Sequence, residues 1–259
     1  NTRPQTYHDR PVVTWWEGTA RRGFGAGQGE IYDTNYQHVA TVKAGNGYDM
    51  DLHEFTLTPQ GTALILAYKA VPGDTTSAPG GGRKDGLVHE NVMQEVDVET
   101  GKVLVQWVGS KDISFSESWN TVPKDPTIPY DYMHLNSVDL TKDGNIVISA
   151  RATHAYYKIN RKTGKLMWRM GGKKSDFKMT KGSRTAFQHD VHQLSPNFWS
   201  AYDNNADEEP AAGAPPKQSR GVILKVDEKR KTVQLRRQFV HPKKILAVSQ
   251  GNMQTLAGG

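Results

Sequence analysis

A repeated strand–turn–strand pattern is the feature that most constrains how this chain can fold. Four segments share a short strand, a polar turn opened by Asp or Asn, and a second strand: IYDTNYQHVATV (31–42), EVDVETGKVLVQW (95–107), KINRKTGKLMWRM (158–170) and KVDEKRKTVQLRR (225–237). The turns begin 64, 63 and 67 residues apart, at Asp33, Asp97, Asn160 and Asp227. Self-similarity at a nearly fixed period is typical of repeat architectures, in which each repeat is one supersecondary unit.

A second type of hairpin lies between these segments. In residues 129–151 (PYDYMHLNSVDLTKDGNIVISAR) two β-rich runs flank an Asp143-Gly144 turn, which is a strong hairpin signal. Residues 51–68 and 187–203 repeat this outline with a His near the start, and residues 249–259 resemble the opening of another copy.

Two hairpins per period make a four-stranded antiparallel unit, which is one blade of a β-propeller. We therefore predict an all-β fold, a single β-propeller domain over residues 1–259 that contains about four blades. Because both ends fall inside a repeat, we expect this domain to be incomplete at both ends. Polar loops separate the hairpins and should gather on the faces of the disc: Pro72 to Asn91, Gly109 to Pro129, Gly172 to Thr185, and Asn204 to Gln218.

Composition excludes several classes of function. The chain has no cysteine, so it has neither a disulfide framework nor a thiolate site. Its net charge of +6 comes from Lys and Arg that are spread over turns without a nucleic-acid-binding motif, so we expect no nucleic-acid partner. The charge instead favours attraction of small anionic substrates. No apolar run approaches the roughly 20 residues of a membrane span.

Three histidines occupy equivalent positions near the start of the second hairpin type: His53, His134 and His189. The first strand of each propeller blade lines the central channel, so these side chains should converge there. His134 and Asn136 are two residues apart and should project from one face of their strand, and Arg151 should return to the same end. A zinc site with three histidines is the alternative, but an arginine is a poor neighbour for a cation, and we expect neither metal nor cofactor.

This set of residues suits the transfer of a tetrahedral anion. Neutral imidazole is a competent nucleophile near pH 7, a second imidazole can exchange the proton of a hydroxyl group, and Arg and Asn can neutralise charge on non-bridging oxygens. The chain has no G-x-S-x-G elbow for serine catalysis. The run Gly171 to Ser175 lacks the frame of a P-loop, so a nucleotide donor is not indicated.

The chain resembles the bacterial-type arylsulfotransferase family, whose members do not use a nucleotide sulfate donor. The similarity extends nearly end to end: VTWWEG (13–18), AGNGYDMDLHEF and LTPQGTALI (44–65), QEVDVETGKVL (94–104), PYDYMHLNSVD and DGNIVISAR (129–151), YKINRKTGKLMWRMGGKKSDF (157–177), FQHD (187–190), SRGVILKVD (219–227) and QGNMQ (250–254). The resemblance implies a propeller that has six blades when complete, among the roughly four to eight blades of closed propellers, and a secreted or extracytoplasmic enzyme. It also implies ping-pong transfer of a sulfuryl group between an aryl sulfate and a phenol through a sulfo-histidine.

Carried over by motif, the resemblance makes His189 the nucleophile, with His192 as a competing candidate. His134, Asn136 and Arg151 would hold the sulfuryl oxygens, and His53 would be the acid/base or a second sulfuryl contact. Ser219 and Arg220 would add a further substrate contact.

Two other functions stay open from the sequence. One is a non-catalytic propeller that binds an anionic or glycan ligand in the same funnel. The other is a quinoprotein-like propeller, suggested by the turns that pair Lys102 with Trp107 and Lys165 with Trp168. Aromatic residues near the His134 strand, on which a phenol could stack, are Phe115, Trp119, Tyr130 and Tyr132.

Overall fold

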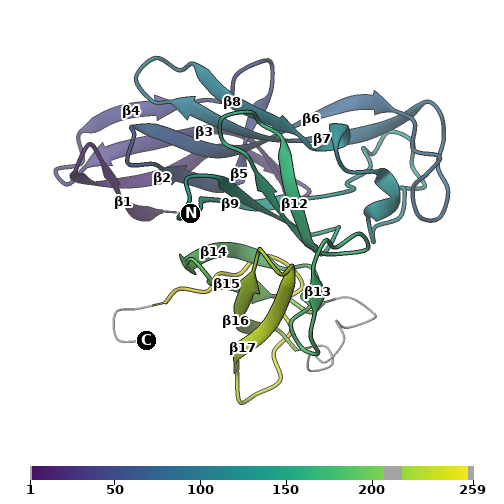
Figure 1. The fold of residues 1–259 in the computed structure, drawn as a ribbon. Helices are drawn as coiled ribbons and strands as arrows, with labels where there is room; N and C mark the ends of the chain where they lie inside the picture. Colours follow the sequence, from purple (N-terminus) through teal and green to yellow (C-terminus); the bar gives the residue numbers. More distant parts are fainter. Residues whose placement is uncertain (1, 207–217, 256–259) are drawn as a thin grey trace.

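A computed structural model describes residues 2–206 and 218–255, which fold into four successive antiparallel units (Figure 1). The first unit contains β1 (Arg3–Tyr7), β2 (Arg10–Arg21), β3 (Phe24–Asp33) and β4 (His38–Val42). The second contains β5 (Asp49–Leu57), β6 (Thr62–Gly73), β7 (Gly86–Asp97) and β8 (Val103–Val108). The third contains β9 (Leu135–Leu140), β10 (Ile146–Ala150), β11 (Ala155–Ile159) and β12 (Leu166–Gly171). The fourth contains β14 (His189–Ser195), β15 (Phe198–Asp203), β16 (Arg220–Asp227) and β17 (Thr232–Val240), with the short β13 (Lys178–Met179) beside β17.

The units form three sheets in an all-β, propeller-like fold, as the repeat predicts. In the third and fourth units each strand pairs with the next one along the chain, so that β9 and β14 are the first strands of four-stranded meanders. The first and second units share one eight-stranded sheet, because β3 also pairs with β5. The only helical segments among the described residues are two 3₁₀ turns, Gly109–Lys111 and Phe115–Glu117, and no helix there is long and apolar enough to span a membrane.

The predicted polar turns have the expected geometry. Asp97 Oδ1 accepts a hydrogen bond from the backbone N–H of Thr100, and Asn160 Oδ1 accepts one from Thr163. Each turn then reaches a glycine with positive φ, Gly101 at 68° and Gly164 at 65°, a conformation that costs glycine little. By contrast, we expected another hairpin to open in residues 249–259, but no strand is assigned in residues 249–255, and residues 256–259 lie outside the described part. Most of the predicted loop Asn204 to Gln218 also lies outside it.

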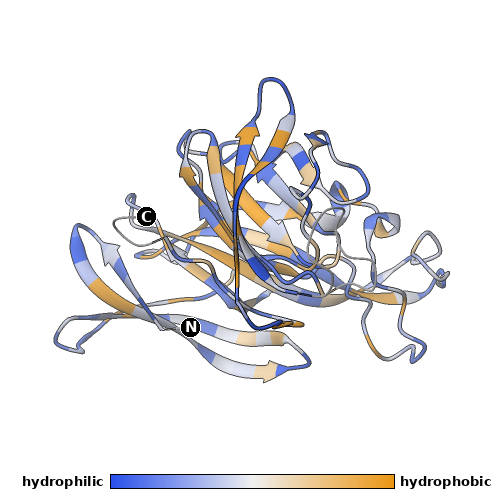
Figure 2. Ribbon diagram, turned by 90° about the horizontal axis from the view of Figure 1, so that it is seen from below, coloured by the Kyte–Doolittle hydropathy of each residue, from blue (hydrophilic) through white to orange (hydrophobic). Residues whose placement is uncertain are grey.

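Hydrophobic residues lie mainly along the strands, and hydrophilic residues predominate in the connecting turns (Figure 2). Buried apolar side chains form clusters that join successive units. One cluster joins the first and second units around Ile31 and Ile65, another joins the second and third around Leu66 and Val138, and a third joins the third and fourth around Val147. Burial of apolar surface between sheets is the main stabilising term of such a stack.

Ion pairs also connect neighbouring units. Arg161 in the third unit donates to both carboxylate oxygens of Glu95 in the second. Lys158, whose side chain is 1% exposed, donates to Glu228 of the fourth unit at 2.8 Å and to Asp143 at 2.7 Å. With Lys158 this close, the pKa of Asp143 falls to about 2 although burial alone would raise it.

Candidate active site

The histidine-bearing first strands meet, and each is interrupted by a bulge. β9 packs against both β5 and β14. The pairing of β5 with β6 skips residues 51–54, that of β14 with β15 skips 190–191, and that of β9 with β10 skips Asn136. A β-bulge bends the strand and re-aims side chains, and bulges are frequent next to active sites. The repeat thus places an irregular backbone segment beside every one of the three histidines.

The structure brings together the four residues that the sequence predicts as catalytic. The rings of His53 and His134 lie 4.9 Å apart in an edge-to-face arrangement. His189 begins β14, which packs against β9, and its pKa is lowered by electrostatic interaction with His53, His134 and Arg151. The cluster therefore joins side chains from the second, third and fourth units.

His189 is buried and held in one orientation. Its Nδ1 lies 2.7 Å from Asn204 Oδ1 and 3.0 Å from the carbonyl oxygen of Phe187, so Nδ1 carries the proton and donates it to these acceptors. Nε2 is then the basic nitrogen, and it accepts a 3.3 Å hydrogen bond from the backbone N–H of Gln250. Burial lowers the pKa of His189 to about 4 despite the opposing effect of Asn204, so the ring is neutral at pH 7.

The other two histidines have carboxylate partners instead. His53 Nδ1 lies 2.5 Å from Asp51 Oδ2, and His134 Nδ1 lies 2.6 Å from Asp131 Oδ2. A carboxylate on Nδ1 orients the ring and leaves Nε2 available, so these rings are placed for proton transfer through Nε2. Within the described ranges, no three His, Asp or Glu side chains are grouped so that they could hold a metal ion.

Asp51, Asp131 and Asn204 are functional candidates that the sequence analysis missed. Asp51 and Asp131 precede their histidines by two and three residues, a local signal that could have been used. Asn204 lies 15 residues after His189 and reaches it only because β14 and β15 form a hairpin. Burial alone would raise the pKa of Asp131, but nearby His134 and Arg151 lower it below its usual value.

Arg151 supplies the positive charge of the cluster. Among the described residues its guanidinium forms no ion pair. Nη2 donates to the carbonyl oxygen of Val248 at 3.2 Å, and the group lies 4.2 Å from the ring centroid of Phe187. Its Nε is buried without a hydrogen-bond partner. Since a buried donor without a partner costs free energy, this N–H is a suitable contact for an anionic ligand.

Our prediction that His134 and Asn136 share one face of their strand is wrong. His134 has a φ of 54°, and its ring contacts His53 in the second unit. Asn136 is turned toward the fourth unit, where Nδ2 donates to the carbonyl oxygen of Gln188 at 2.7 Å. The positive φ and the bulge break the alternation of an ideal strand. The hydrogen bond from Asn136 to Gln188 holds the strand that carries His189. Nδ2 of Asn136 still has a second N–H with which it could contact a ligand.

Ser219 and Arg220 lie behind the histidine cluster. Ser219 Oγ donates to the carbonyl oxygen of Asn204 at 2.8 Å, so it supports the residue that orients His189. Arg220 is 1% exposed. Its guanidinium donates to Asp203, Gln238 and two backbone carbonyl oxygens, Gly182 and Arg184.

His192 is held between two carboxylates. Nδ1 lies 2.8 Å from Asp139 Oδ2, and Nε2 lies 3.2 Å from Asp190 Oδ1. Burial alone would lower the pKa of His192, but these two hydrogen bonds and charges raise it to about 10. A protonated ring has no lone pair for attack, so this geometry favours His189 over His192 as nucleophile.

Raising the pH should remove the stabilisation that His192 provides. Because its folded-state pKa of about 10 lies above the usual 6.5, the contribution is fully present below pH 6.5 and is lost as the pH rises through 10. Melting temperatures of the wild type and His192→Gln should therefore differ strongly at pH 6 and little above pH 10. A difference that is independent of pH would show that packing, not charge, explains the effect.

Most of the aromatic residues noted in the sequence belong to the core. Tyr130 and Tyr132 are fully buried, and Phe115 packs edge-on against Tyr132 at 4.7 Å. Trp107 and Trp168, from the turns that suggested a quinoprotein, are buried, and their indole N–H groups donate to Asp112 and Glu228, respectively. Trp119 differs, since it is 41% exposed.

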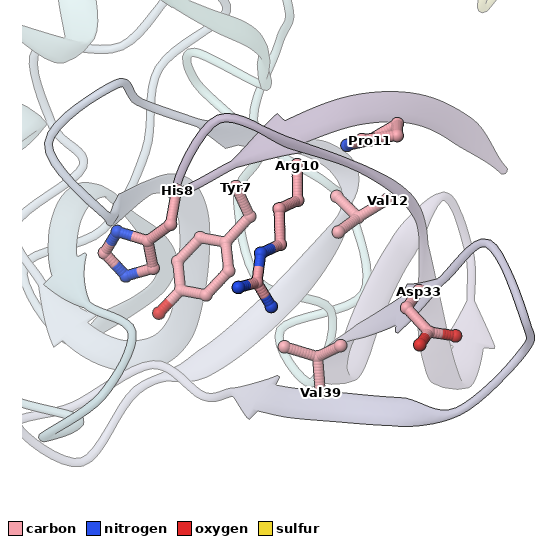
Figure 3. Close-up of a pocket in the computed structure, with 7 residues that line it drawn as sticks. All are labelled: Tyr7, His8, Arg10, Pro11, Val12, Asp33 and Val39. Atoms are coloured by element: carbon pink, nitrogen blue, oxygen red, sulfur yellow. The ribbon is translucent and has the colours of Figure 1, made fainter.

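A separate cavity of about 380 Å³ lies far from the cluster of His53, His134 and His189. Seven residues line it (Figure 3): Tyr7, His8, Arg10, Pro11, Val12, Asp33 and Val39. Val12 pairs with Asp33 at this end of the β2–β3 ladder, while Phe24, which contacts His134 at 5.0 Å, is at the other end. About ten residues of strand, roughly 30 Å, separate the two places. The cavity is therefore no part of the histidine cluster.

Comparison with known proteins identifies the family. The profile of the family described as Arylsulfotransferase (ASST) matches residues 3–259, and the chain belongs to this family. No curated protein matches.

Two solved structures are similar to this chain at low sequence identity. One is a protein of unknown function from Bacteroides caccae, with 13% identity and a TM-score of 0.43, where the match covers 87% of this chain and 61% of that one. The other is a candidate 6-phosphogluconolactonase from Bacteroides fragilis, with 12% identity and a TM-score of 0.42, where the match covers 94% of this chain and 73% of that one. This chain thus spans less than two thirds of the length of the first structure.

Proposed function

We propose that this chain transfers a sulfuryl group from an aryl sulfate to a phenol by a ping-pong mechanism through sulfo-His189. The observation that carries the proposal is the state of His189. It is buried, neutral at pH 7, oriented by Asn204, and placed beside two carboxylate-paired histidines and an arginine without an ion pair. Family membership supports the same class of enzyme and small aryl substrates.

In the first half-reaction His189 Nε2 attacks the sulfur of the donor. The N–S bond forms, the S–O bond to the aryl group breaks, and its electron pair leaves with the phenolate oxygen. The substrate displaces the long contact from the Gln250 N–H. His53 or His134 protonates the leaving oxygen through Nε2 while its carboxylate partner stabilises the ring.

In the second half-reaction the same imidazole removes the proton of the acceptor phenol. The phenol oxygen attacks sulfur, and the S–N bond breaks, so that neutral His189 is restored. Arg151 and the remaining N–H of Asn136 are placed to stabilise negative charge on the non-bridging oxygens in both steps. Ser219 supports Asn204, and through it His189.

Intact-mass spectrometry after mixing with 4-nitrophenyl sulfate tests this proposal. We expect wild type to gain about 80 Da, the mass of one sulfuryl group, and peptide mapping to place the group on His189. His192→Gln serves as the control and should keep the adduct. An adduct on His192, or none while nitrophenol is released, would overturn the sulfo-His189 mechanism. The absence of both the adduct and nitrophenol would favour a propeller that binds anions without catalysis.

Export, which the family resemblance implies, is also part of this proposal, and fractionation of the native host would test it.

Changing Asn204 should shift the pH profile of the nitrophenol burst amplitude on its acid side. The limb that belongs to His189 should lie near pH 4, because the ring must be neutral to attack. Asn204→Asp places a negative charge beside Nδ1 and should move this limb to higher pH, whereas Asn204→Ala removes a hydrogen bond that raises the pKa and should move it lower. Burst amplitudes measured from pH 3.5 to 8 would reveal the opposite shifts. Asn204 Nδ2 also donates to the carbonyl oxygens of Ala247 and Gln250, at 2.9 and 2.8 Å. A shift in the same direction in both variants would mean that Asn204 acts only through these backbone contacts.

A further inference from the structure

A ladder of three rings extends from Arg151 toward the surface. The guanidinium lies over Phe187, and the Phe187 ring meets His154 edge-to-face at 4.6 Å. His154 in turn stacks on Trp119 with centroids 5.1 Å apart and planes 9° apart. We call Phe187, His154 and Trp119 the ring ladder. Its members come from three separate segments of the chain.

The inner end of the ladder is tied to the nucleophile. The carbonyl oxygen of Phe187 accepts a hydrogen bond from His189 Nδ1, so the ring and the nucleophile share one short backbone segment. Phe187 has a φ of 52°, which is costly for a bulky residue and persists only where the surroundings enforce it. The position of this ring is therefore fixed relative to His189.

The middle member of the ladder, His154, is a buried and uncharged ring. His154 is 6% exposed, and burial together with Arg151 and Lys173 lowers its pKa to about 3. The ring is therefore neutral at pH 7 and connects Phe187 to Trp119 by ring contacts without placing a positive charge between them.

The outer member of the ladder, Trp119, is held in place by its neighbours but is exposed to solvent. The backbone N–H of Trp119 donates to the carbonyl oxygen of Ala152 at 2.8 Å, and Lys173 Nζ lies 4.9 Å from the indole centroid while it donates to the Ser116 and Ser118 carbonyl oxygens. Trp119 is thus clamped between His154 and Lys173, and yet 41% of the residue is exposed. A large aromatic side chain that is held this firmly and still exposed is typical of a binding surface.

We propose that the ring ladder is the aryl subsite and that Trp119 selects acceptors with more than one ring. This inference rests on the proposed function. The phenol oxygen of an acceptor must lie next to the sulfuryl group between His189 and Arg151. From there a single ring reaches the Phe187 end of the ladder, whereas the exposed indole lies two rings further out. Only a linked or fused multi-ring phenol extends far enough to make an edge-to-face contact with Trp119.

Acceptor competition tests the subsite. With 4-nitrophenyl sulfate as donor, kcat/KM is measured for phenol and for 4-phenylphenol. Trp119→Ala should lower the value for 4-phenylphenol about tenfold and leave that for phenol unchanged, as expected for the loss of one aromatic contact. Trp119→Phe should recover most of the loss. The matched control is Tyr36→Ala, which removes another exposed aromatic residue from a turn of the first unit and should change neither value.

The outcomes separate the two proposals. Equal losses for both acceptors in Trp119→Ala, or no loss for either, would overturn the subsite while the mass adduct on His189 still supports sulfuryl transfer. A wild type that forms no adduct overturns the proposed function, and the subsite with it.

Discussion

Replacing His189 by alanine should lower kcat for aryl sulfate turnover by about 10⁴-fold, because the nucleophile is the one group whose work no neighbour can take over. In the proposed mechanism His53 and His134, each paired with a carboxylate, serve in proton transfer, and His192 is protonated between two carboxylates. Stopped-flow release of nitrophenol should show no burst in the variant. The loss should be in kcat, since Arg151 and the ring ladder, the groups proposed to bind the substrate, are unchanged in this variant.

Two controls are needed to interpret the loss of turnover in His189→Ala. His38→Ala removes a half-exposed histidine from the first unit and should leave turnover unchanged. The melting temperature of His189→Ala shows how much of the loss is due to unfolding, since its ring is buried. A variant that remains folded and retains more than about a tenth of wild-type kcat would show that sulfur is attacked by another group, and the ping-pong route would fail with it.

The repeat in the sequence predicted the fold because it combined three independent signals. The strand pattern, the Asx turns at Asp97 and Asn160, and the period of 63 to 67 residues all indicate the same four-stranded unit. Equivalence of position then predicted that His53, His134 and His189 converge, which holds although they lie on three different units.

The sequence could not show how each side chain is used, because bulges and tertiary contacts determine it. The skipped residue Asn136 and the positive φ of His134 turn two side chains of one strand toward different neighbours. Only two residues separate His189 and His192, and yet their charge states differ. His189 is neutral because burial lowers its pKa and its side-chain partner is an uncharged amide, whereas His192 is protonated because two carboxylates face it. No periodicity contains this information, since the partners come from other segments.

Arg220→Met should lower the free energy of unfolding by about 3–5 kcal/mol, the usual cost of leaving a buried charge without its partner. The side chains of Arg220 and Asp203 are both fully buried, and Nε lies 2.8 Å from the Asp203 carboxylate. Burial raises the pKa of Asp203 even with the arginine present, so removal of the cation should raise it further. Urea unfolding at pH 7 measures the loss.

A pH series and a double variant show whether charge is the cause. The unfolded-state term is the same in both proteins, so the charge part of the penalty depends on the folded-state pKa of Asp203, which burial already raises in the wild type. This part is lost as falling pH protonates the carboxyl group in both folded proteins. The difference between wild type and Arg220→Met should therefore shrink as the pH falls toward 4. Adding Asp203→Asn removes the charge but keeps an oxygen for the Ala186 and Asn205 N–H groups, and it should restore part of the stability at pH 7. If Arg220 instead binds substrate, as the motif suggests, Arg220→Met should raise KM and leave the unfolding free energy almost unchanged.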